Sequence, residues 1–234
     1  MKLKEFTYGD YSYTYDLIQQ ARKTLSLTVY PNKRIVVKCP SSVGQDCIHH
    51  FLKRKYAWLN KQLRFFDRTN RPTHKKEYVS GESFLYLGRQ YRLILKQAAE
   101  NKVSLTKGKM WVFAGRNGHA GKTGEKLLKE WYRDKAEKVL RERFEAVWDT
   151  FDYRTKPRLN IRPMKTRWGS CSKKGNVTLN TRLIQAPSHC IDYVIMHELC
   201  HLIEHNHSPK YYKLLDRFMP DWKSRKRRLE QHVF

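Results

Sequence analysis

The sequence predicts an α+β protein whose N-terminal portion is rich in strands, and two patterns lead to this prediction. Short runs that alternate apolar and polar side chains recur over residues 1–115, and a period of two is typical of half-buried strands. From residue 125 onward most apolar side chains recur at three- and four-residue spacing, which indicates helices. With 40% hydrophobic residues in 234, the composition is that of a globular protein with one large domain or two small ones.

The first predicted elements lie before residue 67. Strands are expected over three alternating or β-branched runs, 11–18, 24–30 and 35–37. The turn sequence Pro31-Asn32-Lys33 predicts that the last two form a hairpin. Apolar residues at helical spacing between Ile48 and Leu63 predict an amphipathic helix over 44–66. The polar, proline-containing segment 67–76 is expected to be a loop and a first candidate for a sub-domain break.

Further strands are expected before the main predicted boundary. Four short apolar runs indicate them, at 84–87, 91–95, 103–105 and 110–113. Lys107-Gly108 between the last two is a hairpin signal. The Gly- and Lys-rich segment 116–124 is predicted to separate a β-rich portion, 1–115, from a helical core, 125–234. In that core a long helix and two strands are expected first, at 125–149, 159–164 and 176–180. No internal repeat is visible in the sequence.

Basic residues outnumber acidic ones by 48 to 22, which gives a formal net charge of +26. A surplus of this size creates a positive potential over much of the surface and attracts polyanions. Nucleic acid and nucleotides are therefore candidate partners, as are ribosomes and acidic proteins. The plainer interpretation is a generically basic protein whose lysines keep it in solution, because net charge governs association and not a specific site.

The cysteines predict a reducing compartment, because their number is odd and no C-x-x-C pair occurs. The first residues contain no apolar run of signal-peptide length, and no window reaches the ~18 apolar residues of a membrane span. We therefore expect a cytoplasmic protein that does not act at a membrane. The five cysteines are Cys39, Cys47, Cys171, Cys190 and Cys200.

A zinc site is predicted at His197-Glu198-Leu199-Cys200-His201, which fits the pattern H-E-x-x-H. Positions i and i+4 of a helix lie on one face, so both imidazoles can reach one cation. Glu198, on the neighbouring flank, could take a proton from a zinc-bound water, whose pKa the metal lowers toward ~7. A helix is expected there, because Pro187-Ser188 resembles an N-cap and an apolar stripe extends from Ile191 to Leu202.

An open catalytic zinc site also requires a third protein ligand. His207 is favoured, because Asn206 is a residue that ends helices and Ser208-Pro209 is typical of the start of the next one. A turn of this kind would fold His207 back toward the histidine pair. Glu204 and His205 are the alternatives, Glu204 if the first helix continues that far.

Several other motifs accompany this pattern in a fixed order. They are Thr166-Arg167-Trp168-Gly169-Ser170-Cys171, Gly175, Leu179-Asn180, Pro187, Ile191-Asp192-Tyr193-Val194 and Asn206-His207-Ser208. Together with the H-E-x-x-H sequence they resemble the YgjP-like, SprT-related zinc metallopeptidase family. The resemblance is close over residues 165–212. One departure is Tyr211-Tyr212, where the family pattern leads us to expect Phe-Trp.

The resemblance implies a minigluzincin-like metallopeptidase core, in which the edge strand of a small sheet lies over the active-site helix. Residues 176–180 would form that edge strand, to which a substrate polypeptide could add as a further strand. The ligands of one zinc ion per chain would be His197, His201 and His207. Glu198 would be the general base of peptide-bond hydrolysis. The candidates for contacts with substrate or an oxyanion are Arg167, Asn180 and Tyr211.

Several of these residues also have a structural interpretation. Arg167 could stabilise an oxyanion or hold a phosphate, or it could form an ion pair with Asp192. Trp168 is interpreted as a core residue, and so are the thiols of Cys171 and Cys200.

The C-terminal segment 223–228 contains five basic residues in six and follows Pro220-Asp221-Trp222, a helix-start pattern. This run could contact a phosphate backbone while Trp222 stacks on a base, or it could be the solvated face of a terminal helix.

The leading functional hypothesis is a zinc peptidase. The first alternative is a metal-dependent nucleotide phosphohydrolase of the nucleoside triphosphate pyrophosphatase type, which the charge and Arg167 would suit. The second is a nucleic-acid-binding protein with a structural zinc ion.

Overall fold

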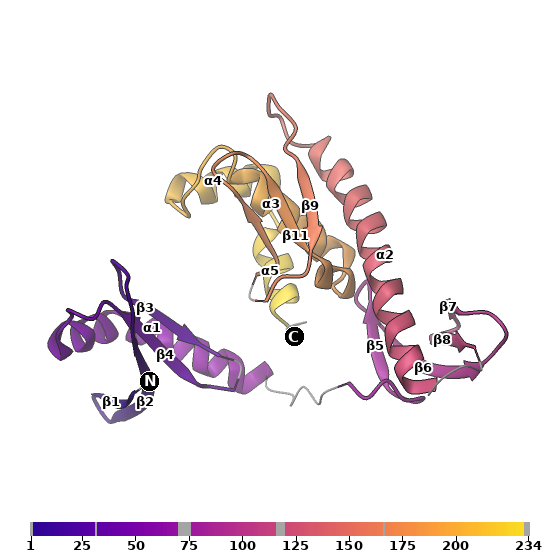
Figure 1. Ribbon diagram of the computed structural model, residues 1–234. Coiled ribbons are helices and arrows are strands. Elements are labelled where there is room, and N and C mark those ends of the chain that lie inside the picture. Colours follow the sequence, from indigo (N-terminus) through magenta and orange to yellow (C-terminus); the bar gives the residue numbers. More distant parts are fainter. Residues whose placement is uncertain (1, 31, 70–75, 116–119, 166, 232–234) are drawn as a thin grey trace. The chain divides into compact units, whose positions relative to one another are not determined.

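The computed structural model describes residues 2–30, 32–69, 76–115, 120–165 and 167–231 (Figure 1). The chain divides into two compact units, Met1–His74 and Lys75–Phe234. Each unit combines sheet and helix, which confirms the α+β prediction. None of the helices in the described residues is long and apolar enough to cross a membrane.

The first unit is a four-stranded sheet with one long helix. Its elements are β1 (Lys2–Tyr8), β2 (Tyr11–Gln19), β3 (Ser26–Val29), β4 (Ile35–Cys39) and α1 (Gln45–Thr69). The strand order is β1-β2-β4-β3, with antiparallel pairs at both ends and a parallel pair, β2 and β4, in the middle. The β3–β4 pair confirms the predicted hairpin. Val37 of the sheet and Leu52 of the helix lie in the buried core that joins them.

The second unit begins with a sheet of the same design. Its strands are β5 (Ser83–Tyr86), β6 (Arg89–Gln97), β7 (Lys102–Thr106) and β8 (Lys109–Ala114). Their order, β5-β6-β8-β7, again has a parallel pair in the middle and antiparallel pairs at the ends. A long helix, α2 (Ala120–Trp148), follows this sheet just as α1 follows the first. The fold therefore repeats a topology that the sequence does not reveal.

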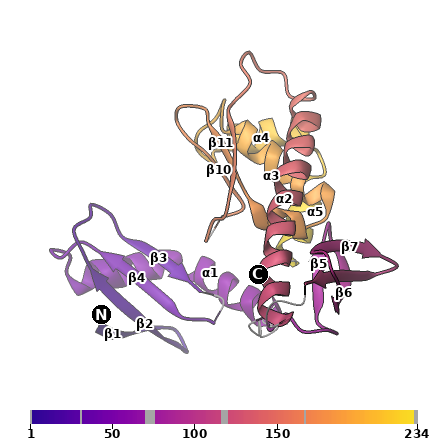
Figure 2. The ribbon, with the colours of Figure 1, turned by 45° about the vertical axis from the view of Figure 1, so that its right-hand side comes forward.

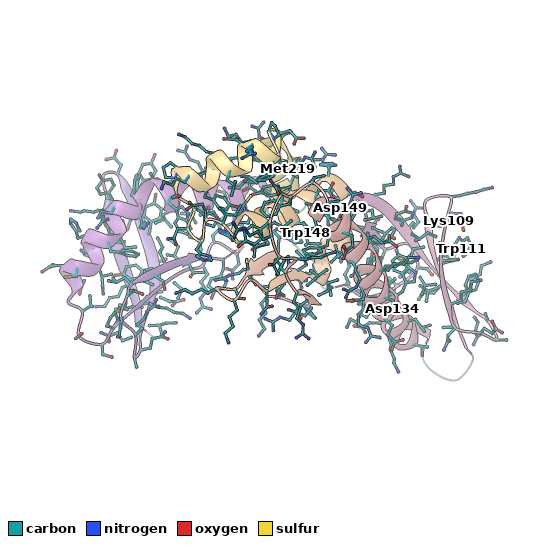
Figure 3. The ribbon with its side chains drawn as sticks, turned by 90° about the horizontal axis from the view of Figure 1, so that it is seen from above. Lys109, Trp111, Asp134, Trp148, Asp149 and Met219 are labelled. Atoms are coloured by element: carbon teal, nitrogen blue, oxygen red, sulfur yellow. The ribbon has the colours of Figure 1, made fainter. Side chains whose placement is uncertain are left out.

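Helix α2 belongs to two cores. Near its start Leu128 packs with the β5–β8 sheet, and further along Leu140 and Phe144 pack with the C-terminal elements. Trp148 and Met219 belong to this second core. Figure 3 shows them well apart from Lys109 and Trp111, which belong to strand β8.

This sharing of α2 changes the predicted domain division. The segment 116–124 was expected to be a connector between domains, but the helix already begins at Ala120 and residues 116–119 lie outside the described part. Gly124 sits on the sheet, where an added Cβ would lie 2.9 Å from Leu95 Cδ2. The units instead divide at His74 and Lys75, within the first candidate break.

The C-terminal part consists of a three-stranded sheet and four helical segments (Figure 2). They are β9 (Leu159–Arg162), β10 (Gly169–Cys171), β11 (Val177–Asn180), the 3-10 helix η1 (Thr181–Gln185), α3 (Ser188–Cys200), α4 (Pro209–Phe218) and α5 (Trp222–Gln231). The strand order is β10-β11-β9. The predicted edge strand, 176–180, is therefore the central strand, because the Gly-containing segment before it forms β10. Consistent with a central position, Val177 and Leu179 are fully buried.

The turn between β5 and β6 fixes the start of α3. The backbone N–H groups of Leu87 and Gly88 donate to the carbonyls of Ile184 and Gln185, at 2.8 and 3.0 Å. Gly88 has a φ of +77°, and a Cβ added there would lie 2.6 Å from Pro187 Cγ. The position thus requires glycine for its backbone conformation and for the close approach of Pro187.

We expect Gly88→Ala to destabilise the protein by about 2–4 kcal/mol, since it combines a strained φ with overpacking against Pro187. Gly108→Ala is the matched control, because Gly108 has a φ of +73° but open space around its Cβ position. The control should lose only about 1 kcal/mol. Urea unfolding of both variants tests this, and equal losses would contradict the packing argument.

Candidate metal centre

Helix α3 carries the first two histidines and is mostly buried. It begins after Pro187, whose extended backbone makes it the N-cap residue, and no side chain forms a cap hydrogen bond there. The predicted Pro187-Ser188 pair thus marks the start of the helix but forms no side-chain cap. Ile191, Ile195 and Leu199 are fully buried, which confirms the apolar stripe within α3, whereas Leu202 lies beyond the end of the helix and is half-buried.

The imidazoles of His197, His201 and His207 converge at the C-terminal end of α3. His201 is the C-cap residue of α3, and His207 lies in the turn before α4. One ring nitrogen from each histidine lies within 4.8 Å of the others. Among the described residues no other three His, Cys, Asp or Glu side chains converge in this way. These three residues could therefore hold a metal ion.

The turn that carries His207 has the predicted form. Ser208 is the N-cap of α4 and accepts a hydrogen bond from the Tyr211 N–H, and Pro209 is the first helical residue. The two alternative ligands do not join the cluster. Glu204 contributes its backbone carbonyl, which lies 3.0 Å from His201 Nδ1, and His205 is exposed on the cleft wall.

Hydrogen bonds assign the tautomers of the first two histidines. The Tyr211 hydroxyl lies 3.0 Å from the His197 carbonyl, to which it donates, and 2.7 Å from His197 Nδ1. Because the hydroxyl has a single proton, Nδ1 of His197 must carry the proton of that second bond. His201 Nδ1 donates likewise to the Glu204 carbonyl. Both Nε2 atoms therefore keep a free lone pair, as metal ligands require.

The charge state of the cluster also suits a cation. Burial lowers the pKa of His197 to about 3, with smaller contributions from His201, His207 and Lys226. Burial likewise lowers the pKa of His207. Neutral imidazoles are the form that binds metals. The 3.1 Å between Nε2 of His197 and Nε2 of His207 is close to the ~3.3 Å of two nitrogens at tetrahedral zinc distances. The donor set thus fits zinc, although three imidazoles also suit other divalent ions.

Glu198 lies next to the histidines and packs against strand β10. Its side chain is buried, and burial raises the pKa of its carboxyl group to about 8, although Arg167 and the Cys171 backbone N–H oppose the rise. A Cβ on Gly169 would lie 2.8 Å from Glu198 Oε1, so glycine is needed for this approach. A cation at the histidines would also oppose the rise, because an opposite charge favours the carboxylate.

Strand β10 presents backbone groups toward Glu198. It pairs with β11 through the bonds from Asn180 N–H to the Trp168 carbonyl and from Ser172 N–H to the Asn176 carbonyl. In an antiparallel pair the backbone groups of successive residues point alternately toward and away from the partner strand. Gly169 and Cys171 therefore direct their N–H and C=O groups away from β11. Among the described strands β10 pairs only with β11, which makes this its free edge.

A cleft of about 660 Å³ gives access to these groups. Its walls come from β10 and its flanks, from α3, from the turn at 205–207 and from α5. Arg167 is exposed at this cleft, and Trp168 and Cys171 are half-buried there. The sequence predicts Trp168 and Cys171 as core residues, and both do pack against the core from the cleft side. Cys200, by contrast, is fully buried as expected.

The other two predicted contact residues, Asn180 and Tyr211, are buried and are not among the residues that line the cleft. Asn180 is fully buried; its side-chain NH₂ donates to the carbonyls of Met164 and Arg167, and its side-chain oxygen accepts from Arg182 N–H. It therefore holds the segment before β10 in place. Tyr211 is also fully buried and binds His197. Sequence reasoning missed this role and the role of Gly169, although a glycine inside a strand signals close approach.

Asp192 binds other arginines than the one the sequence suggested. Its carboxylate accepts two hydrogen bonds from Arg143 of α2, one of them at 2.7 Å, and lies 3.7 Å from Arg225 of α5. It lies in the second turn of α3. The ion pair between Arg167 and Asp192 that the sequence left open is thus replaced by a link between α2, α3 and α5.

Helix α5 includes the basic run 223–228. Trp222 is buried, lies parallel to the rings of Tyr193 and Tyr212, and donates its indole N–H to Asp216 at 2.6 Å. It is therefore a packing residue and is not positioned to stack on a base.

Three imidazoles and a buried glutamate at one cleft define a candidate metallohydrolase. The sequence model of the YgjP-like family, metallopeptidase domain, matches residues 23–232. The chain therefore belongs to the YgjP-like metallopeptidase domain family, which confirms the resemblance and makes it a hydrolase of the peptidase class.

Two solved structures are similar to parts of the chain. The metallopeptidase zymogen abylysin of Pyrococcus abyssi is 23% identical with a TM-score of 0.37, and the match covers 40% of this chain and 94% of abylysin. The metallopeptidase zymogen jannalysin of Methanocaldococcus jannaschii is 20% identical with a TM-score of 0.34, over 42% of this chain and 97% of jannalysin. A comparison with curated proteins finds no match.

We expect Asp192→Asn to destabilise the protein by about 2–3 kcal/mol, because it leaves Arg143 and Arg225 without their shared carboxylate. Asp221→Asn is the matched control, since Asp221 also pairs with Arg225 but is 57% exposed. That change should cost less than about 1 kcal/mol. Denaturant unfolding measures both, and a larger loss for the control would contradict the role given to Asp192.

Proposed function

We propose that the protein is a zinc-dependent peptidase in which His197, His201 and His207 hold one zinc ion per chain and Glu198 is the general base. The observation that carries the proposal is the geometry of the cleft. Three imidazoles and one buried carboxyl group face the same space, and the free edge of β10 borders it.

Glu198 performs the proton transfers of the proposed reaction. When bound, zinc supplies Lewis acidity, which makes a water molecule more acidic and polarises the scissile carbonyl. Glu198 accepts a proton from that water and can return it to the leaving amine. The Cys171 N–H, which donates to this carboxyl group, stabilises its ionised form.

Strand β10 is the proposed binding edge for the substrate. Gly169 offers its N–H and C=O groups there, and Cys171 offers its C=O. An extended peptide that pairs with these groups becomes an added strand next to Glu198. Arg167 lies on the same wall of the cleft and can contact an oxyanion or a charged substrate group.

The structure gives less support to the alternatives. A structural zinc site is closed by four protein ligands, whereas the cluster in the described residues has three and opens on a cleft. A nucleotide phosphohydrolase would use the same metal ligands. The two activities are therefore best distinguished by testing which substrates the protein hydrolyses.

Replacement of Glu198 by glutamine should reduce hydrolysis by about 10²–10⁴-fold, because general-base catalysis is lost. Zinc content and the unfolding midpoint should stay unchanged, since Glu198 is not a ligand. The assay compares denatured proteins with nucleoside triphosphates as substrates of the zinc-loaded protein. Activity that survives the substitution, or release of phosphate without peptide cleavage, would refute the proposal.

Loss of the Tyr211 hydroxyl should weaken zinc binding by about 10–100-fold, since it orients His197 and fixes its tautomer. The variant is Tyr211→Phe, and the measurement is competition with a chromophoric chelator. Tyr212→Phe serves as the control, because that neighbour is 37% exposed. Equal zinc affinities of the two variants would contradict the orienting role.

A further inference from the structure

Three cationic side chains line the cleft of the candidate metal centre: Arg167, Lys173 and Lys226. Arg167 precedes strand β10 and Lys173 follows it, whereas Lys226 comes from α5. All three side chains are exposed. Their charges therefore border the space that a substrate enters, at both ends of the strand to which it would pair.

These cations differ from others in the same core. Arg143 and Arg225 share the carboxylate of Asp192. Within the described part of the chain, by contrast, no carboxylate forms an ion pair with Arg167, Lys173 or Lys226. The half-buried arginines of this core thus have a carboxylate of the protein as partner, whereas the cleft cations are available to a ligand.

The acidic groups of the cleft wall offset this charge only in part, because two carboxyl groups, those of Glu198 and Glu230, face three cations. Glu198 is only 6% exposed and is assigned to proton transfer. A divalent ion at the histidines would add two positive charges. The cleft therefore attracts anionic substrates.

We propose that the preferred substrates are acidic peptides, with Asp or Glu side chains next to the scissile bond, and that Arg167, Lys173 and Lys226 determine this preference. The inference rests on the proposed peptidase function. Strand β10 is short, and an extended peptide advances about 3.3 Å per residue. Residues within two or three positions of the scissile bond would therefore reach the cations at either end of β10.

The test uses the full zinc-loaded chain and two fluorogenic peptides that differ only in charge. One has Glu on both sides of the scissile bond, and the other has Gln at the same positions. We expect kcat/KM to be about three- to tenfold higher for the Glu peptide at low ionic strength. The advantage should shrink at high salt, because the ion pairs form at an exposed surface.

A charge-reversal variant identifies the residues responsible. Lys226→Glu should remove or invert the preference for the Glu peptide. Lys223→Glu is its matched control: both lysines belong to α5 and lie over the Trp222 ring, but only Lys226 lines the cleft. The control should keep the wild-type preference. A preference that both variants lose equally would overturn the assignment to Lys226.

A binding measurement separates recognition from turnover. Zinc-loaded Glu198→Gln protein should bind the labelled Glu peptide more tightly than the Gln peptide, as fluorescence anisotropy would show. If the wild-type protein cleaves both peptides equally, or prefers the Gln peptide, this inference fails and the peptidase proposal stands. If it cleaves neither peptide but hydrolyses nucleoside triphosphates, the proposed function fails, and the acidic-peptide inference with it.

Discussion

The carboxyl group of Glu198 sits between helix α3 and strand β10 at 6% exposure, and much of the C-terminal part is arranged around it. Burial of a carboxylate is unfavourable unless hydrogen bonds or opposite charges compensate. Here the Cys171 N–H and Arg167 do so in part, and both depend on how closely β10 approaches. Gly169 permits that approach, and Asn180 holds the preceding segment through two backbone carbonyls. A proton acceptor is thereby positioned before any substrate binds.

The histidines depend on a second set of buried contacts. The Tyr211 hydroxyl and the Glu204 carbonyl each accept a ring N–H bond, so the ligand nitrogens point toward one another. Tyr211 comes from α4 and Glu204 from the segment between α3 and α4. The site is therefore assembled by the packing of consecutive elements, not by α3 alone. Asp192 extends this support to α2 and α5 through Arg143 and Arg225.

The sequence predicted features that follow from local spacing. The helix from Ile191 to Leu199, the turn at Asn206 and the convergence of His207 all depend on short-range signals, and the structure has them. The sequence did not predict that 176–180 is a central strand, because its neighbour Gly169–Cys171 has only three residues. A strand of that length is too short to show a period of two. The contacts of Asp192 and Asn180 were also out of reach, since their partners come from distant or irregular segments. Periodicity likewise identified the strands before residue 115 except β1 (Lys2–Tyr8), but it did not predict the strand order that the two N-terminal sheets share.

The basic residues that give the protein its high net charge have different roles in different parts of the fold. A formal charge of +26 predicts attraction of polyanions but no site, because surface charge alone has no geometry. The structure separates the cations into two groups. Arg143 and Arg225 bind a carboxylate within the core and contribute to its stability. Arg167, Lys173 and Lys226 are exposed at the cleft, where an acidic substrate can supply further counter-charge. Lys226 connects the two groups, because it lies one residue after Arg225, and the ion pair of Arg225 with Asp192 fixes the helix that brings Lys226 to the cleft.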